Sequence, residues 1–178
     1  MSLTDNFSFN PVRYFLVGYF GFGNTGDEAC LQQTKKLILS LDASPQFQSL
    51  STTHKENGHV YRWSLWRVMK ALFWSDKVVF SGGSLFQNVT SSMSLVYYCG
   101  IGILGRVFQK EVLLLGQGYG PVRGVFQKKI VSWVLGYVAC ISARDSDSFD
   151  QWPGWNSFFD FYSARHLDYT KWNRVAMD

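Results

Sequence analysis

Residues 21–28 read Gly-Phe-Gly-Asn-Thr-Gly-Asp-Glu, and residues 81–88 read Ser-Gly-Gly-Ser-Leu-Phe-Gln-Asn. Each run follows a short apolar segment typical of a β-strand and precedes a segment whose apolar residues have helical spacing. A glycine-rich loop between a strand and a helix presents backbone N–H groups at the helix N-terminus, where proteins bind anions and phosphorylated ligands. Two such loops predict a ligand site at one edge of a sheet.

Strand and helix patterns alternate along the first 150 residues. We expect strands at 14–17, 47–51, 77–80, 111–115 and 137–143, and helices at 27–41, 64–74, 95–108 and 125–135. In the second helix, Leu65, Val68, Leu72 and Phe73 form one predicted apolar stripe. Near-continuous apolar strands between helices are typical of a parallel sheet covered on both faces. The sequence therefore predicts an α/β fold with a doubly wound parallel sheet, in which residues 1–150 form a Rossmann-like domain.

Residues 151–178 have a different character. They are rich in Trp, Phe and Tyr and show no strand period. We expect them to form a divergent, poorly ordered aromatic tail outside the domain.

Composition limits the classes of protein. The chain has 178 residues, of which 47% are hydrophobic and 17% charged, and a net charge of +4, which is typical of a globular protein. No basic run is dense enough to predict nucleic-acid binding. Cys30, Cys99 and Cys140 are odd in number and lack C-x-x-C spacing, which favours reduced core cysteines of a cytoplasmic protein. The N-terminus lacks the pattern of a signal peptide. The apolar stretch 95–105 is shorter than the roughly 20 residues that a membrane-spanning helix needs.

The first loop leaves several interpretations open. The spacing Gly21-x-Gly23-x-x-Gly26 fits a dinucleotide fingerprint. However, Asp27 and Glu28 would repel a pyrophosphate at the helix start, and no acidic residue ends the second strand. The loop would otherwise be a tight turn capped by Asn24, Thr25 or Asp27, or a loop that binds another substrate.

Polar residues also follow the later strands. The second loop leads into a cluster suited to hydrogen bonding with sugar hydroxyls or phosphate oxygens, made of Gln87, Asn88, Thr90, Ser91, Ser92 and Ser94. N-capping by Ser91 or Ser92 explains only part of that cluster. Gln117 lies between two glycines after the fourth expected strand. Arg144 follows the last one, where a guanidinium can bind a carboxylate or phosphate, or simply pair with Asp145 or Asp147.

The segment 62–70 mixes basic and aromatic residues. It would either lie on an anionic membrane surface or form a helix with one face in the core and the other in solvent. His54 and His59 are expected in a polar loop, and no spacing of His, Cys, Asp or Glu predicts a metal site.

Four segments together resemble the polysaccharide pyruvyl transferase family. Residues 18–29 are similar to the opening of these enzymes, and residues 81–98 to their Gly-Gly-Gly-Ser-Leu-Leu-Gln loop and the helix after it. Residues 116–121 and 141–145 resemble two further family motifs in the same order. The resemblance covers roughly residues 13–149. Ser81 stands where the family usually has glycine.

The resemblance implies a two-domain fold like that of GT-B glycosyltransferases. Such enzymes transfer an enolpyruvyl-derived group from phosphoenolpyruvate to a sugar, forming a pyruvate ketal in cell-wall or surface polysaccharide biosynthesis and releasing phosphate. Phosphoenolpyruvate is then a co-substrate, and no cofactor is implied. The acceptor in the cell-wall branch is a lipid-linked saccharide on the cytoplasmic face of the membrane, so peripheral membrane contact is implied as well.

The same resemblance suggests roles for individual residues. Arg144 would contact the carboxylate or phosphate of the donor as the third catalytic residue beside Asp27 and Glu28, one of which would act as general base. The remaining substrate-binding residues would be Gly23, Asn24, Gly82, Gly83, Ser84, Gln87, Gln117 and Asp145.

The resemblance is to the first domain of the family alone. We therefore expect a truncated or frame-shifted product with little or no transferase activity by itself, because the donor would lack half of its charged partners. Two other functions stay open: a GT-B-type glycosyltransferase that uses a nucleotide sugar, and a non-catalytic domain that binds a saccharide or a partner chain.

Overall fold

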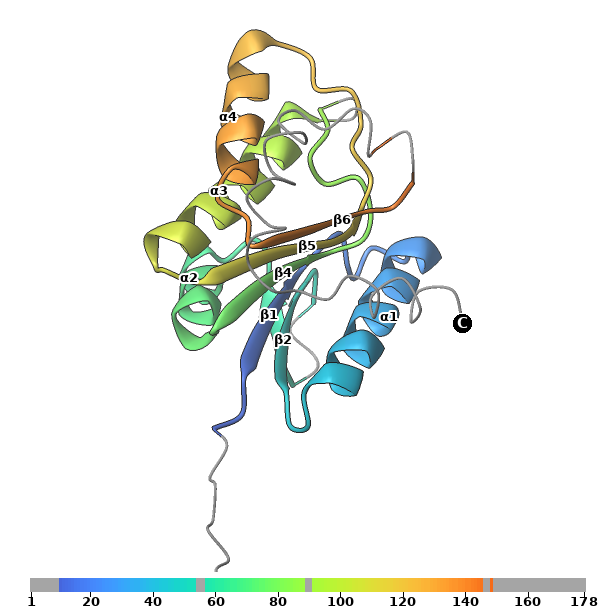
Figure 1. Ribbon diagram of the computed structural model, residues 1–178, viewed down its shortest axis with the longest axis vertical. Coiled ribbons are helices and arrows are strands. Elements are labelled where there is room, and N and C mark those ends of the chain that lie inside the picture. Colours follow the sequence, from blue (N-terminus) through green and yellow to red (C-terminus); the bar gives the residue numbers. More distant parts are fainter. Residues whose placement is uncertain (1–9, 54–56, 89–90, 146–147, 149–178) are drawn as a thin grey trace, which may run out of the picture.

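The computed structural model describes residues 10–53, 57–88, 91–145 and 148 (Figure 1). The strands are β1 (Arg13–Val17), β2 (Gln46–Ser51), β3 (His59–Tyr61), β4 (Lys77–Ser81), β5 (Glu111–Gln117) and β6 (Cys140–Ala143). The helices are α1 (Thr25–Leu41), α2 (Leu65–Trp74), α3 (Ser92–Val107) and α4 (Val125–Leu135). The predicted aromatic tail, residues 151–178, lies outside the described residues.

All described strands form one parallel sheet with the order β3-β2-β1-β4-β5-β6. This is the strand order of a Rossmann-like fold. The direction of winding reverses between β1 and β4, because β1 is followed by β2 on one side while β4 lies on its other side. Ligands of such sheets bind at the carboxyl ends of the strands beside this reversal. The loops after β1 and β4 are the two glycine-rich runs of the sequence.

Helices cover both faces of the sheet, which confirms the doubly wound prediction. Figure 1 shows α1 on one face and α2, α3 and α4 on the other. The side chains of β1 alternate between the two cores, with Tyr14 and Leu16 packed on the α1 side and Phe15 and Val17 on the opposite side. Both sets are buried, so residues 14–17 of this strand are apolar on both faces of the sheet.

Most predicted elements are present with bounds shifted by up to three residues; for example, α3 begins at Ser92 and β5 continues to Gln117. Two further differences concern β3 and β6. The short strand β3 was missed, because its three residues include His59 and follow a polar segment; His59 is half-buried in this strand rather than in a loop. The last strand begins at Cys140 rather than at residue 137.

The predicted stripe of α2 is wrong in part. Val68 and Leu72 are buried, together with Ala71, whereas Leu65 and Phe73 are exposed. The position of a helix relative to its sheet decides which residues of a broad apolar stripe reach the core.

The three cysteines have free thiols; Cys99 and Cys140 are buried and Cys30 is half-buried. Burial raises the pKa of the Cys99 thiol to about 12. Within the described ranges, the helices are too short or too polar to cross a bilayer.

A pair of glycine substitutions tests the packing of the second loop. Gly82 has a φ of +61°, and a Cβ atom there would overlap Cβ of Cys30 on α1. Gly100 lies inside α3, and a Cβ atom there meets no other atom. Gly82→Ala should lower the free energy of unfolding by about 2–3 kcal/mol. Gly100→Ala should raise it by about 0.5–1 kcal/mol, because alanine favours a helix. Urea unfolding of both variants measures the two values, and equal effects would contradict the packing.

Candidate functional site

The start of α1 closes the loop after β1, and Gly21 and Gly23 in this loop have positive φ angles. Asn24 is the N-cap: its Oδ1 accepts from the backbone N–H of Gly26 at 3.1 Å, and its Nδ2 donates to Asp27 Oδ2 at 2.5 Å. Glu28 Oε1 accepts from the backbone N–H of Gly21 at 2.7 Å. Asn24 and Glu28 therefore hold the shape of this loop, and Asp27 is the carboxylate that lies deepest in it.

Sequence reasoning missed Arg62, which packs against residues of the loop after β1. Arg62 directly follows β3, is buried, and donates from Nη2 to Tyr98 Oη at 2.7 Å. Its guanidinium carbon lies 4.8 Å from the ring centre of Phe22 and 5.4 Å from that of Tyr19. Within the part of the chain that the structure describes, no carboxylate pairs with it.

The rings of Tyr19 and Phe22 stack on each other, with their centres 3.9 Å apart. The Arg62 guanidinium makes a cation–π interaction with each ring. Tyr98 Oη also donates to the backbone oxygen of Gly18 at 3.3 Å. A buried arginine after a strand is hard to recognise from sequence when the three-residue strand before it is missed.

The loop after β4 packs directly against α1. Ser81 Oγ donates to the backbone oxygen of Cys30 at 3.2 Å and lies 2.7 Å from Thr34 Oγ1. A Cβ atom added to Gly83 would lie 3.0 Å from Asp27 Oδ1. The two glycine-rich loops thus meet where the Asp27 carboxyl faces Gly83.

The surroundings of Asp27 raise the pKa of its carboxyl. Burial raises its pKa, and the negative charge of Glu28 raises it further, whereas the hydrogen bond from Asn24 lowers it. A carboxyl with a raised pKa at the edge of a loop is suited to accept and return a proton.

The loop after β5 contacts the glycine-rich loop after β4, and the segment after β6 contacts the end of β5. The backbone N–H of Gly118 donates to the oxygen of Gly83 at 2.7 Å, and the N–H of Arg144 donates to the oxygen of Gln117 at 3.0 Å. A Cβ atom on Gly118 would overlap Ser84 Oγ and would lie 3.0 Å from Arg144 Cζ. Ser84 and the Arg144 guanidinium therefore converge above Gly118.

Gln117 is the last residue of β5 rather than part of a loop, and its side chain is fully buried. Its Nε2 donates to the backbone oxygen of Gly82 at 2.6 Å, whereas Oε1 has no hydrogen-bond partner within the described residues. A buried amide oxygen without a donor is uncommon, because it loses its hydration without compensation.

Arg144 is half-exposed and its Nε donates to Asp145 Oδ2 at 2.9 Å. Asp145 Oδ1 accepts from the backbone N–H of Ser148 at 2.8 Å. Hydrogen bonds from Ser148, and then from Arg144, lower the pKa of Asp145 to about 2. Asp145 is thus a charged residue that orients the Arg144 side chain through its Nε.

The other predicted residues lie around this centre. Gln87 packs on Gly120, and Asn88 exchanges two hydrogen bonds with the backbone of Arg123, at 2.7 and 2.8 Å. These contacts brace the segment after β5. Gly23 is exposed at the tip of the first loop. The structure therefore brings Asp27, Gly83, Ser84, Gln117 and Arg144 together, while Gln87 and Gly23 lie at the margin.

A Rossmann-like α/β protein with a polar site across the carboxyl edge of its sheet is the class that this arrangement defines. The model of the polysaccharide pyruvyl transferase family matches residues 24–156, which is well over half of the chain. The chain belongs to this family. No curated protein and no solved structure matches it.

The pKa of Asp27 is a direct test of this site. In a ¹³C NMR titration of the carboxyl groups, Asp27 should titrate above 3.8, the ordinary value for aspartate. Glu28→Gln keeps an acceptor for Gly21 but removes the charge, so the pKa of Asp27 should fall. Asn24→Asp keeps the N-cap acceptor but replaces the amide donor by a carboxylate, so that pKa should rise. Titration of Asp27 below 3.8 in the unsubstituted protein would contradict the burial of this group.

Proposed function

We propose that this site transfers an enolpyruvyl-derived group from phosphoenolpyruvate to a saccharide of a cell-wall or surface polysaccharide. The observation that carries the proposal is that a proton-accepting carboxyl and a guanidinium flank consecutive residues of one loop. Asp27 lies at Gly83, while Ser84 and Arg144 lie together over Gly118. Family membership supports the same chemistry.

The donor, phosphoenolpyruvate, has two anionic groups, and we expect it to bind next to the positively charged Arg144. The terminal nitrogens of Arg144 would bind its carboxylate or phosphate in two parallel hydrogen bonds, as guanidinium groups do. The hydroxyl of Ser84 would take a further polar group of the ligands.

The acceptor side would be at Asp27. One saccharide hydroxyl would give its proton to the Asp27 carboxylate as its oxygen attacks C2 of phosphoenolpyruvate, while C3 takes a proton and becomes a methyl group. A second hydroxyl of the same saccharide then replaces the phosphate at C2, and its proton leaves with the phosphate. The two hydroxyl protons balance those gained by the methyl group and by the released phosphate.

Binding of phosphoenolpyruvate tests this proposal without requiring turnover. Arg144→Gln should weaken binding about tenfold or more in isothermal titration, because a charge-assisted pair is lost. Arg106→Gln is the matched control: Arg106 is near the end of α3, where its guanidinium lies over Tyr137, and this change removes the same charge. It should change the affinity less than twofold.

Two results would contradict the proposal. One is equal weakening by both substitutions, which would indicate binding to the overall positive charge alone. The other is stabilisation of the fold by nucleotide sugars in a thermal-shift series in which phosphoenolpyruvate has no effect. That result would favour a nucleotide-sugar glycosyltransferase instead.

A further inference from the structure

The most exposed large apolar side chains of the described residues lie at equivalent places in three different helices. Six of them are 69–77% exposed, whereas every other large apolar residue is less so. Trp63, Leu65 and Trp66 are at the start of α2, Met93 is at the start of α3, and Val125 and Phe126 are at the start of α4.

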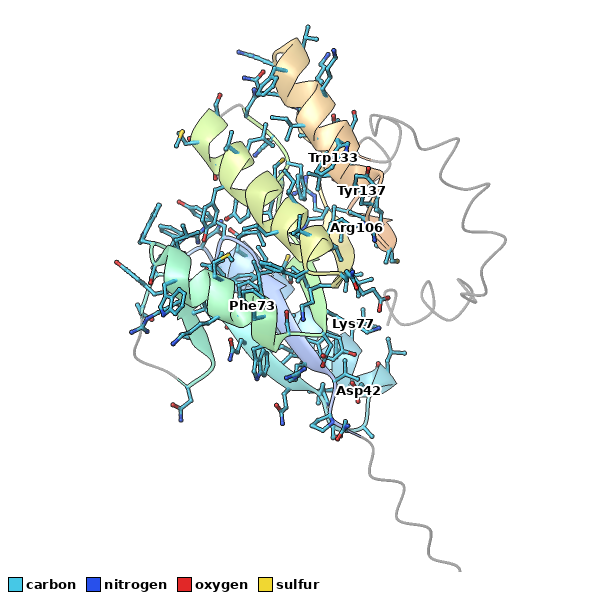
Figure 2. All side chains as sticks on the ribbon, turned by 90° about the vertical axis from the view of Figure 1, so that its left-hand side faces the viewer. Asp42, Phe73, Lys77, Arg106, Trp133 and Tyr137 are labelled. Carbon is cyan, nitrogen blue, oxygen red and sulfur yellow. The ribbon has the colours of Figure 1, made fainter. Side chains whose placement is uncertain are left out.

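These three helix starts lie along one edge of the molecule. Each helix follows a strand or its loop in a parallel sheet, so its N-terminus lies at the carboxyl edge, where the candidate site is. Figure 2 shows α2, α3 and α4 side by side over the same face. The aromatic pair Tyr19 and Phe22, on the first loop, is also partly exposed at this edge.

The charges on these helices have a single sign. No Asp or Glu occurs in α2, α3 or α4. Arg67, Lys70, Lys128 and Lys129 lie in the first two turns of α2 and α4, whereas Arg106 lies in the last turn of α3, away from this edge. Their first turns contain no acidic residue, so the positive ends of the helix dipoles are not neutralised there. The first turn of α1, on the other face, contains Asp27 and Glu28. Nζ of Lys70 lies 5.2 Å from the Trp66 ring centre, so a cation accompanies an exposed indole.

We propose that this edge, formed by the N-terminal ends of α2, α3 and α4, docks on the surface of an anionic phospholipid membrane. Tryptophan, phenylalanine and aliphatic side chains enter the boundary between headgroups and acyl chains, and the lysines and arginines bind the lipid phosphates. A second copy of the chain fits this surface less well, because symmetric contact would place the same positive charges opposite each other.

The candidate site opens on the same carboxyl edge as the docking residues. Docking would therefore hold the site beside the bilayer, where it meets molecules anchored in the membrane. The inference rests on exposure and charge alone, so it stands or falls independently of phosphoenolpyruvate binding.

Co-sedimentation with vesicles tests the docking edge. The chain should bind vesicles that contain phosphatidylglycerol at least about tenfold more strongly than vesicles of phosphatidylcholine alone, and high salt should weaken the binding. The double variant Trp66→Ala and Phe126→Ala should weaken binding to the anionic vesicles roughly tenfold.

A matched double variant lies at the opposite ends of the same two helices. Phe73→Ala and Trp133→Ala also removes one phenylalanine and one tryptophan from α2 and α4 (Figure 2). It should change vesicle binding less than twofold, with circular dichroism confirming that both variants fold.

Three outcomes would overturn the proposal. The first is the absence of a preference for anionic vesicles. The second is equal loss of binding in both double variants, which would mean that the whole helical face is involved rather than its edge. The third is a dimer in light scattering that the Trp66 and Phe126 substitutions dissociate, which would assign the surface to a second copy of the chain.

Discussion

The candidate site depends on backbone pairing that continues past the ends of the strands. Gly82 donates to Leu115 at 2.8 Å, Gly118 to Gly83 at 2.7 Å, and Arg144 to Gln117 at 3.0 Å. These bonds extend the sheet beyond β4, β5 and β6 into the loops that carry the polar side chains. Because these backbones lie so close together, the Ser84 hydroxyl and the Arg144 guanidinium occupy the space next to Gly118, and a side chain at position 118 would overlap them.

Three buried polar groups lie close to this edge, and their burial is unusual for an otherwise apolar sheet. Asp27 has a raised pKa, Gln117 has an acceptor without a donor in the described chain, and Arg62 has aromatic rings and a tyrosine hydroxyl as its partners. Each group lowers stability relative to an apolar residue of similar shape. Groups of this kind are common at functional sites, where stability is exchanged for a fixed arrangement of charge.

Much of the fold follows from the sequence, because most of its strands are apolar runs and α1, α2 and α3 begin at residues whose side chains cap the helix. Asn24, Ser64 and Ser91 are N-caps, and α4 has the predicted bounds. β3 could not be predicted in this way. It has only three residues, and it is stabilised by pairing with β2, which local sequence patterns do not indicate.

The location of the candidate site could also be predicted from the sequence, but its internal contacts could not. Residues that end strands in a parallel sheet share an edge, so the convergence of Asp27, Gly83 and Arg144 followed from motif order. The internal bonds of Glu28, the burial of Gln117 within β5 and the position of Arg62 depend on loop geometry and on the missed strand. Spacing along the chain does not specify these features. For the surface formed by the helix starts, the sequence indicated only the basic and aromatic run 62–70. The starts of α3 and α4 are distant from this run in sequence, and only the fold places them beside it.

Amide hydrogen exchange measures the extension of the sheet most directly. In NMR exchange experiments, the amides of Gly82 and Gly118 should exchange as slowly as that of Leu114 inside β5, and the exposed amide of Gly23 should exchange fast. Fast exchange at Gly82 and Gly118 together with slow exchange at Leu114 would contradict the account, because the loops would then not be joined and their side chains would not share one site.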